Sequence, residues 1–92
     1  MSQIYQLPAI ISHENVEDVL LAIEKILKAL PSSDSLTINC QELKSFDSTA
    51  LSLILSIKRR AEKSSVAIHL NNVPEKLASL AKVYDLADIV LS

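Results

Sequence analysis

Apolar residues recur along this chain at two different spacings, and the alternation of those spacings predicts its elements. Between residues 16 and 30 apolar positions lie three and four residues apart, as on one face of a helix. This face consists of Val16, Val19, Leu20, Ile23, Ile26, Leu27 and Leu30. Pro31 ends the helix. From residue 36 to residue 40 apolar and polar side chains alternate, which predicts a strand.

The two spacings continue to alternate toward the C-terminus. A second helix is predicted from about residue 48 to residue 63, with an apolar stripe on its inner face. The stripe consists of Ala50, Leu53, Ile54, Ile57 and Ala61. Residues 66–70 form a third predicted strand, and Pro74 suits the first turn of a third helix. The residues of that helix predicted to face inward are Leu77, Leu80, Ala81 and Tyr84. Residues 89–91 are predicted to form either a last short strand or a docked tail.

The N-terminal segment completes the order of the elements. Residues 4–11 are extended but interrupted by Pro8, which predicts either an edge strand or a bent pair of short strands. Asn15, followed by acidic residues, is predicted to cap the first helix. Strands that alternate with helices imply a largely parallel sheet with right-handed crossovers. We therefore predict a single α/β domain over residues 1–92, with residues 40–48 at the carboxyl ends of the strands, where partners often bind.

The composition excludes several classes of function. The 92 residues contain no glycine, which rules out the glycine-rich loops that bind nucleotide phosphates. A net charge of −2 and the small number of aromatic residues, one Phe and two Tyr, argue against nucleic-acid binding. Cys40, the single cysteine, fits a core position in a reducing compartment. His13 and His69 lack metal-ligand spacing, and neither can be assigned as a base, so we expect no metal, no cofactor and no enzymatic activity.

The sequence shows no recognisable membrane-targeting or membrane-spanning segment. It lacks the basic start and apolar run of a signal peptide, and no stretch approaches the roughly 18 apolar residues that span a bilayer. We therefore expect a cytoplasmic protein that reaches a membrane only through a partner.

The candidate chemistry lies in the segment Phe46-Asp47-Ser48-Thr49-Ala50-Leu51, which opens the second predicted helix. The first backbone N–H groups of a helix lack intrahelical partners, and the helix dipole favours negative charge there. Asp47 is expected to cap the helix, either as its whole role or while also orienting Ser48 or a partner residue. Thr49 is a weaker candidate than Ser48 because its side chain can turn inward.

A stripe of small polar residues continues from this segment. Ser48, Ser52 and Ser56 lie four residues apart, and Leu51 and Leu55 are predicted to flank them. The stripe is either a solvated face or a docking surface. Serine is a mediocre helix former, and a helix face exposed only to solvent would more naturally carry Glu, Lys or Gln. We therefore predict that the stripe is a docking surface for a partner. Further along lies a basic cluster suited to an acidic patch on a protein partner, formed by Lys58, Arg59, Arg60 and Lys63.

These segments resemble the STAS domain, the fold of bacterial anti-sigma-factor antagonists and of sulfate transporter tails. The likeness covers most of the chain from about residue 5. Its carrying segments are residues 36–40, 46–55, 66–70 and 72–77, followed by Tyr84-Asp85-Leu86. The chain looks most like the MlaB branch, through residues 73–77 with Leu80 and Tyr84 and through its small size. It departs from the family at Ala50, at or near which other members carry Gly.

The resemblance implies a non-catalytic interaction subunit. MlaB-type proteins are cytoplasmic subunits of a phospholipid-transporting ABC complex that maintains outer-membrane lipid asymmetry. They bind its ATPase, which joins a permease at the inner membrane. A hydroxyl at the position of Ser48 is implicated in that contact. The predicted partner-binding residues are Asp47, Ser48, Thr49, Leu51, Ser52, Leu55 and Ser56.

Two alternatives to the transporter subunit stay open. In the anti-sigma antagonists the hydroxyl directly after the Asp is phosphorylated, which corresponds to Ser48. The alternative function is therefore an anti-sigma factor antagonist switched by phosphorylation of Ser48, with a serine kinase that also sequesters a sigma factor as its partner. A third possibility is a small-ligand domain that holds an anion or a lipid on the same surface.

Overall fold

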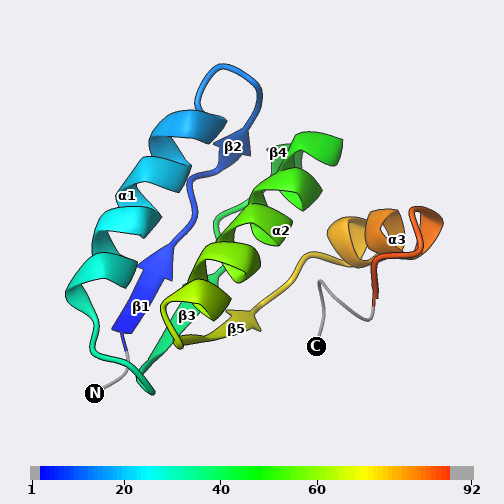
Figure 1. Ribbon diagram of the computed structural model, residues 1–92. Coiled ribbons are helices and arrows are strands. Elements are labelled where there is room, and N and C mark those ends of the chain that lie inside the picture. Colours follow the sequence, from blue (N-terminus) through cyan, green and yellow to red (C-terminus); the bar gives the residue numbers. More distant parts are fainter. Residues whose placement is uncertain (1–2, 88–92) are drawn as a thin grey trace.

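The computed structural model describes residues 3–87 and places two parallel helices over one face of a three-stranded sheet, with a third helix to one side (Figure 1). The elements in chain order are β1 (Gln3–Gln6), β2 (Ile10–Ile11), α1 (Val16–Ala29), β3 (Ser35–Asn39), β4 (Ser45–Phe46), α2 (Ser48–Lys63), β5 (Ala67–Asn71) and α3 (Glu75–Val83). The predicted α/β class is confirmed, as are the three helices.

The main sheet has the order β1-β3-β5, and both strand pairs are parallel. In its register Tyr5 lies beside Ile38, and Ile38 lies beside Leu70. The N-terminal segment is a bent pair of short strands, because β1 ends before Pro8 and β2 begins after it. β2 leaves the main sheet and pairs in parallel with β4. The sequence did not predict β4, since two residues are too few to show an alternation.

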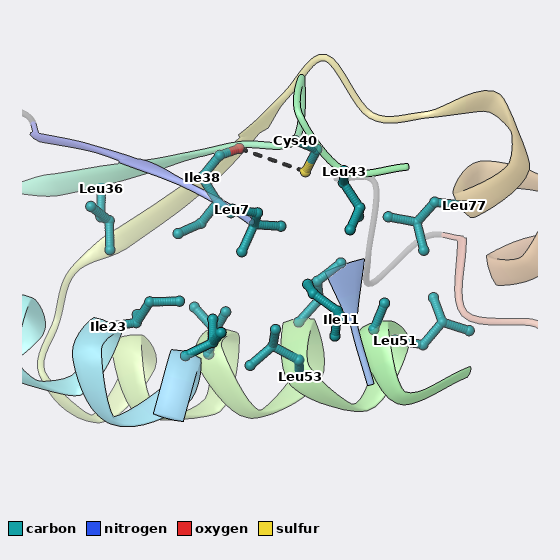
Figure 2. Packing of buried hydrophobic residues seen from close by; sticks show 14 of the residues in the cluster. Leu7, Ile11, Ile23, Leu36, Ile38, Cys40, Leu43, Leu51, Leu53 and Leu77 are labelled. Carbon is teal, nitrogen blue, oxygen red and sulfur yellow. Dashed lines mark hydrogen bonds between the residues drawn. The ribbon is translucent and has the colours of Figure 1, made fainter. Parts of the chain in front are cut away.

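The core fills the space between the sheet and the two long helices (Figure 2). On β3 the alternating residues Leu36 and Ile38 are fully buried beneath the helices. α1 contributes Val19, Ile23 and Leu27. α2 contributes the whole predicted stripe, Ala50, Leu53, Ile54, Ile57 and Ala61, and also Leu51. α3 is anchored by Leu77 and Ala81.

Cys40 is a core residue, as predicted. It directly follows β3, and its Sγ lies 3.9 Å from the carbonyl oxygen of Ile38. Burial raises the pKa of this thiol to about 11, so Cys40 stays protonated at neutral pH and is a poor nucleophile.

Two local expectations were only partly right. Asn15 occupies the N-cap position of α1, but its side chain makes no capping hydrogen bond. Its Oδ1 instead accepts from the Ser12 N–H and its Nδ2 donates to the Ile10 carbonyl, so it fastens the turn before the helix. Tyr84, predicted to face inward, is 54% exposed at the end of α3, so that prediction is wrong. The expected element at residues 89–91 lies outside the described residues.

Turns in this glycine-free chain use other residues in the left-handed region. Ser33, Ser65, Asn72 and Asp85 all have φ between 55° and 71°. Asn and Asp tolerate this region better than most residues, because their short side chains can bond to the nearby backbone. Within residues 3–87 no helix has both the length and the apolar character needed to cross a bilayer.

Candidate functional site

The start of α2 is held by Asp47. Its backbone is extended, and its Oδ1 accepts a hydrogen bond of 2.8 Å from the Thr49 N–H, which satisfies one of the unpaired donors of the first turn. Hydrogen bonds from the Thr49 side chain and then from its backbone N–H lower the pKa of Asp47 below its usual value. Asp47 is therefore an ionised helix cap, as the sequence predicted.

Two other segments of the chain lie around this helix start. His13, in the turn between β2 and α1, is close enough for its charge to lower the pKa of Asp47 further. Lys76, in the first turn of α3, places its Nζ 5.7 Å from the centre of the Phe46 ring, which is a cation–π contact. Neither residue was predicted from the sequence, because both are distant from Asp47 along the chain and no spacing links them to it. Only the fold brings two basic side chains to this end of α2.

The predicted serine stripe rotates around α2 from open solvent toward α1. Ser48 and Ser52 are exposed, whereas Ser56 is half-buried. Leu55 is also half-buried and packs against the core. We call Asp47, Ser48 and Ser52, with His13 and Lys76 beside them, the α2-start surface.

Leu51 does not belong to the exposed surface that the sequence assigned to it. Only 3% of the residue is exposed, and it points from α2 into the core, in the same cluster as Leu77 (Figure 2). The reason is helical geometry: Leu51 follows Ala50 and lies about one turn before Ile54, and both of these neighbours are buried. The expectation that Leu51 flanks a docking face is therefore wrong, and its place is beneath the first turns of α2.

Thr49 turns toward α1, where it lines a shallow groove. The groove has a volume of about 180 Å³ and is lined by Val16, Glu17 and Leu20 of α1 and by Thr49, Ser52, Leu53 and Ser56 of α2. We call it the α1–α2 groove. The sequence placed small residues on α2 but contained no signal that α1 would supply the opposite wall.

The basic cluster predicted from the sequence is divided by the fold. Arg59 is exposed, whereas the Arg60 Nε donates to the Glu24 carboxylate across the two helices. Lys58 is half-buried, and burial lowers the pKa of its amine. These side chains therefore do not act as one basic patch.

Comparison with known proteins gives the family. The family model of the MlaB-type STAS domain matches residues 10–91. This chain belongs to the MlaB-type STAS family. No curated protein sequence matches it.

Solved structures confirm the predicted STAS fold. The unphosphorylated anti-sigma factor antagonist SpoIIAA superimposes with a TM-score of 0.76 at 18% identity, over 99% of this chain and 78% of its own. A sulfate transporter family protein from Wolinella succinogenes gives a TM-score of 0.70 at 13% identity, over 97% of this chain and 70% of its own. At these identities the likeness shows the fold alone.

Proposed function

We propose that this MlaB-type STAS chain is a non-catalytic subunit that binds and regulates the ATPase of a phospholipid-transporting ABC transporter. The observation that carries the proposal is the match to the MlaB-type family over residues 10–91. In this proposal the chain is cytoplasmic and reaches the inner membrane only through the ATPase and its permease.

The α2-start surface is the proposed centre of the contact. Ser48 is exposed on the first turn, and Asp47 beside it already uses its Oδ1 in capping the helix. A small hydroxyl next to an occupied carboxylate lets a partner backbone approach closely. Ser52 extends this surface along α2, and buried Leu51 holds the turn from beneath.

Regulation then follows from mass action. A subunit that binds one conformation of the ATPase more tightly than another shifts the population toward the conformation it binds. No catalytic group on this chain is required. The expected result is an ATPase that is more stable, and more often in its active arrangement, when the chain is bound.

The test is affinity purification of the tagged chain from mildly solubilised native membranes, with mass spectrometry of what accompanies it. We expect the wild type to recover an ABC ATPase and Ser48→Arg to lose it. Ser79→Arg, on the exposed side of α3, is the matched control and should retain it. Recovery of no ATPase with the wild type would overturn the proposal.

The second candidate is an antagonist switched by phosphorylation, which the exposure of Ser48 on a first helical turn favours. A phosphate there adds about −1.5 to −2 charges, which the helix dipole favours and which adjacent Asp47 opposes. This candidate predicts that a serine kinase or sigma-regulatory protein is recovered in place of the ATPase. It also predicts the mass of one phosphate on Ser48 in cells, and weaker partner binding by Ser48→Asp.

A further inference from the structure

We infer that the α1–α2 groove receives an amphipathic helix of the ATPase, which inserts an apolar side chain beside Ser52 and places acidic side chains near Lys63. The inference rests on the proposed function, because it names the partner segment that the same face of the chain would bind. It extends the contact from the start of α2 to a groove that α1 helps to form.

The groove is apolar in its lining and open at the surface. Leu20 and Leu53 line it from opposite helices, while Ser52 and Ser56 are small enough to leave it unfilled. Leu21 follows Leu20 on the outer side of α1 and is 55% exposed. A large apolar side chain from a partner would remove this apolar surface from water, which is the main favourable term in association.

A second hollow, of about 210 Å³, lies between the other ends of the same two helices. Its lining residues are Glu24, Leu27, Lys28, Arg60, Lys63 and Ser64. The one carboxylate there, Glu24, is neutralised by its ion pair with Arg60. Lys28 and Lys63 have no ion pair within residues 3–87. This end of the helix pair is therefore positive and complementary to acidic side chains.

The two hollows are arranged along one line. α1 and α2 run side by side in the same direction, so both hollows follow the same pair of helices (Figure 1). On α2 the lining residues of the two hollows are centred about nine positions apart, which corresponds to roughly 13 Å at 1.5 Å per residue. Residues seven, eight or eleven apart share one face of a helix, and these spacings span roughly 10 to 17 Å. One face of a partner helix can therefore reach both hollows.

The charges of the two hollows also determine which end of the partner helix carries its acidic residues. Glu17 lines the apolar groove and disfavours an acidic residue there, whereas Lys28 and Lys63 favour one at the opposite end. The two lysines also lie in or near the last turns of their helices, where cations offset the dipole. That role alone would affect stability and leave partner affinity unchanged, so affinity separates the two roles.

The experiment measures the affinity of purified variants for the purified ATPase subunit. Ser56→Phe fills the groove and should weaken binding about tenfold or more, because the apolar side chain of the partner loses its place. Lys63→Glu should weaken binding about three- to tenfold, with the loss shrinking at high salt. The matched controls are Ser79→Phe and Lys82→Glu, both at exposed positions of α3, and both should bind like the wild type.

A photo-cross-linking residue in place of Leu21 identifies the occupant and keeps the test valid if Ser56→Phe fails to fold. We expect the cross-linked peptide to come from an ATPase helix with acidic residues seven to eleven positions from the cross-linked region. Cross-linking to a second copy of this chain, or to an ATPase segment without acidic residues, would overturn the inference. If the ATPase binds the wild type and all four variants equally, the groove inference fails and the proposed function stands. If it binds none of them, including the wild type, both fail.

Discussion

Leu51→Ala tests whether Leu51 is a core residue and not part of the docking face that the sequence predicted. Leu51 is 3% exposed and belongs to the hydrophobic core cluster, which also includes Leu77 of α3. Replacing a fully buried Leu by Ala generally costs about 2–5 kcal/mol, because transfer free energy is lost and a cavity is left. The site lies near a helix start, where the surroundings can relax in part, so we expect a loss of about 3 kcal/mol in the free energy of unfolding.

The assay is urea unfolding followed by far-ultraviolet circular dichroism. A domain of this size has a total stability of about 5–15 kcal/mol, so Leu51→Ala should remain folded in water, with a lower midpoint and an unchanged slope. Leu21→Ala is the matched control, since the same atoms are removed from a residue that is 55% exposed, and its change should stay within about 0.5 kcal/mol. If Leu51→Ala lowers the free energy of unfolding by less than about 1 kcal/mol, Leu51 is not a core residue and the reasoning fails.

Three further predictions concern individual polar groups. The pKa of Asp47 is lowered in the folded state, so its contribution to stability is present above its unfolded pKa of about 3.9 and lost as pH falls through the folded value. Asp47→Asn should therefore be less stable than the wild type at pH 7, and the difference should shrink below about pH 4 in unfolding curves measured across pH. Cys40 has a folded pKa raised to about 11, so stability should fall as pH rises toward that value, and Cys40→Ala should remove this fall. In the native protein the Cys40 thiol should also resist a thiol reagent at pH 8 until urea is added. A double-mutant cycle of Glu24→Gln and Arg60→Gln should give a coupling below about 1 kcal/mol, because both side chains are partly exposed; a coupling well above that would mean the pair is more desolvated than the structure shows.

The helices and strands with regular apolar spacing could be predicted from the sequence. The face of α1 around Val19, Ile23 and Leu27 repeats at helical spacing over four turns, and the alternation of β3 matches a half-buried strand. Local patterns of this kind depend on neighbours in sequence. The capping role of Asp47 was predictable for the same reason, because its acceptor and the Thr49 donor are two residues apart.

The parts that sequence reasoning missed depend on contacts between distant segments. Lys76 reaches Phe46 only because the fold brings the start of α3 close to β4. Arg60 reaches Glu24 only because α1 and α2 pack beside one another. Leu51 was misplaced because it lies at the edge of the apolar stripe of α2, and the packing of other segments decides whether such an edge is covered. The groove needs both α1 and α2, so no pattern within one helix could reveal it.

The most direct test of the account is calorimetric titration of the purified chain into the purified ATPase subunit of the phospholipid transporter from the same cells. We expect saturable binding by the wild type and by Ser79→Arg, and loss of binding by Ser48→Arg when all three are equally folded. Absence of binding by the wild type would contradict the proposal that this chain is a subunit that binds the ATPase. Unchanged binding by Ser48→Arg would show that the ATPase docks elsewhere than on the α2-start surface.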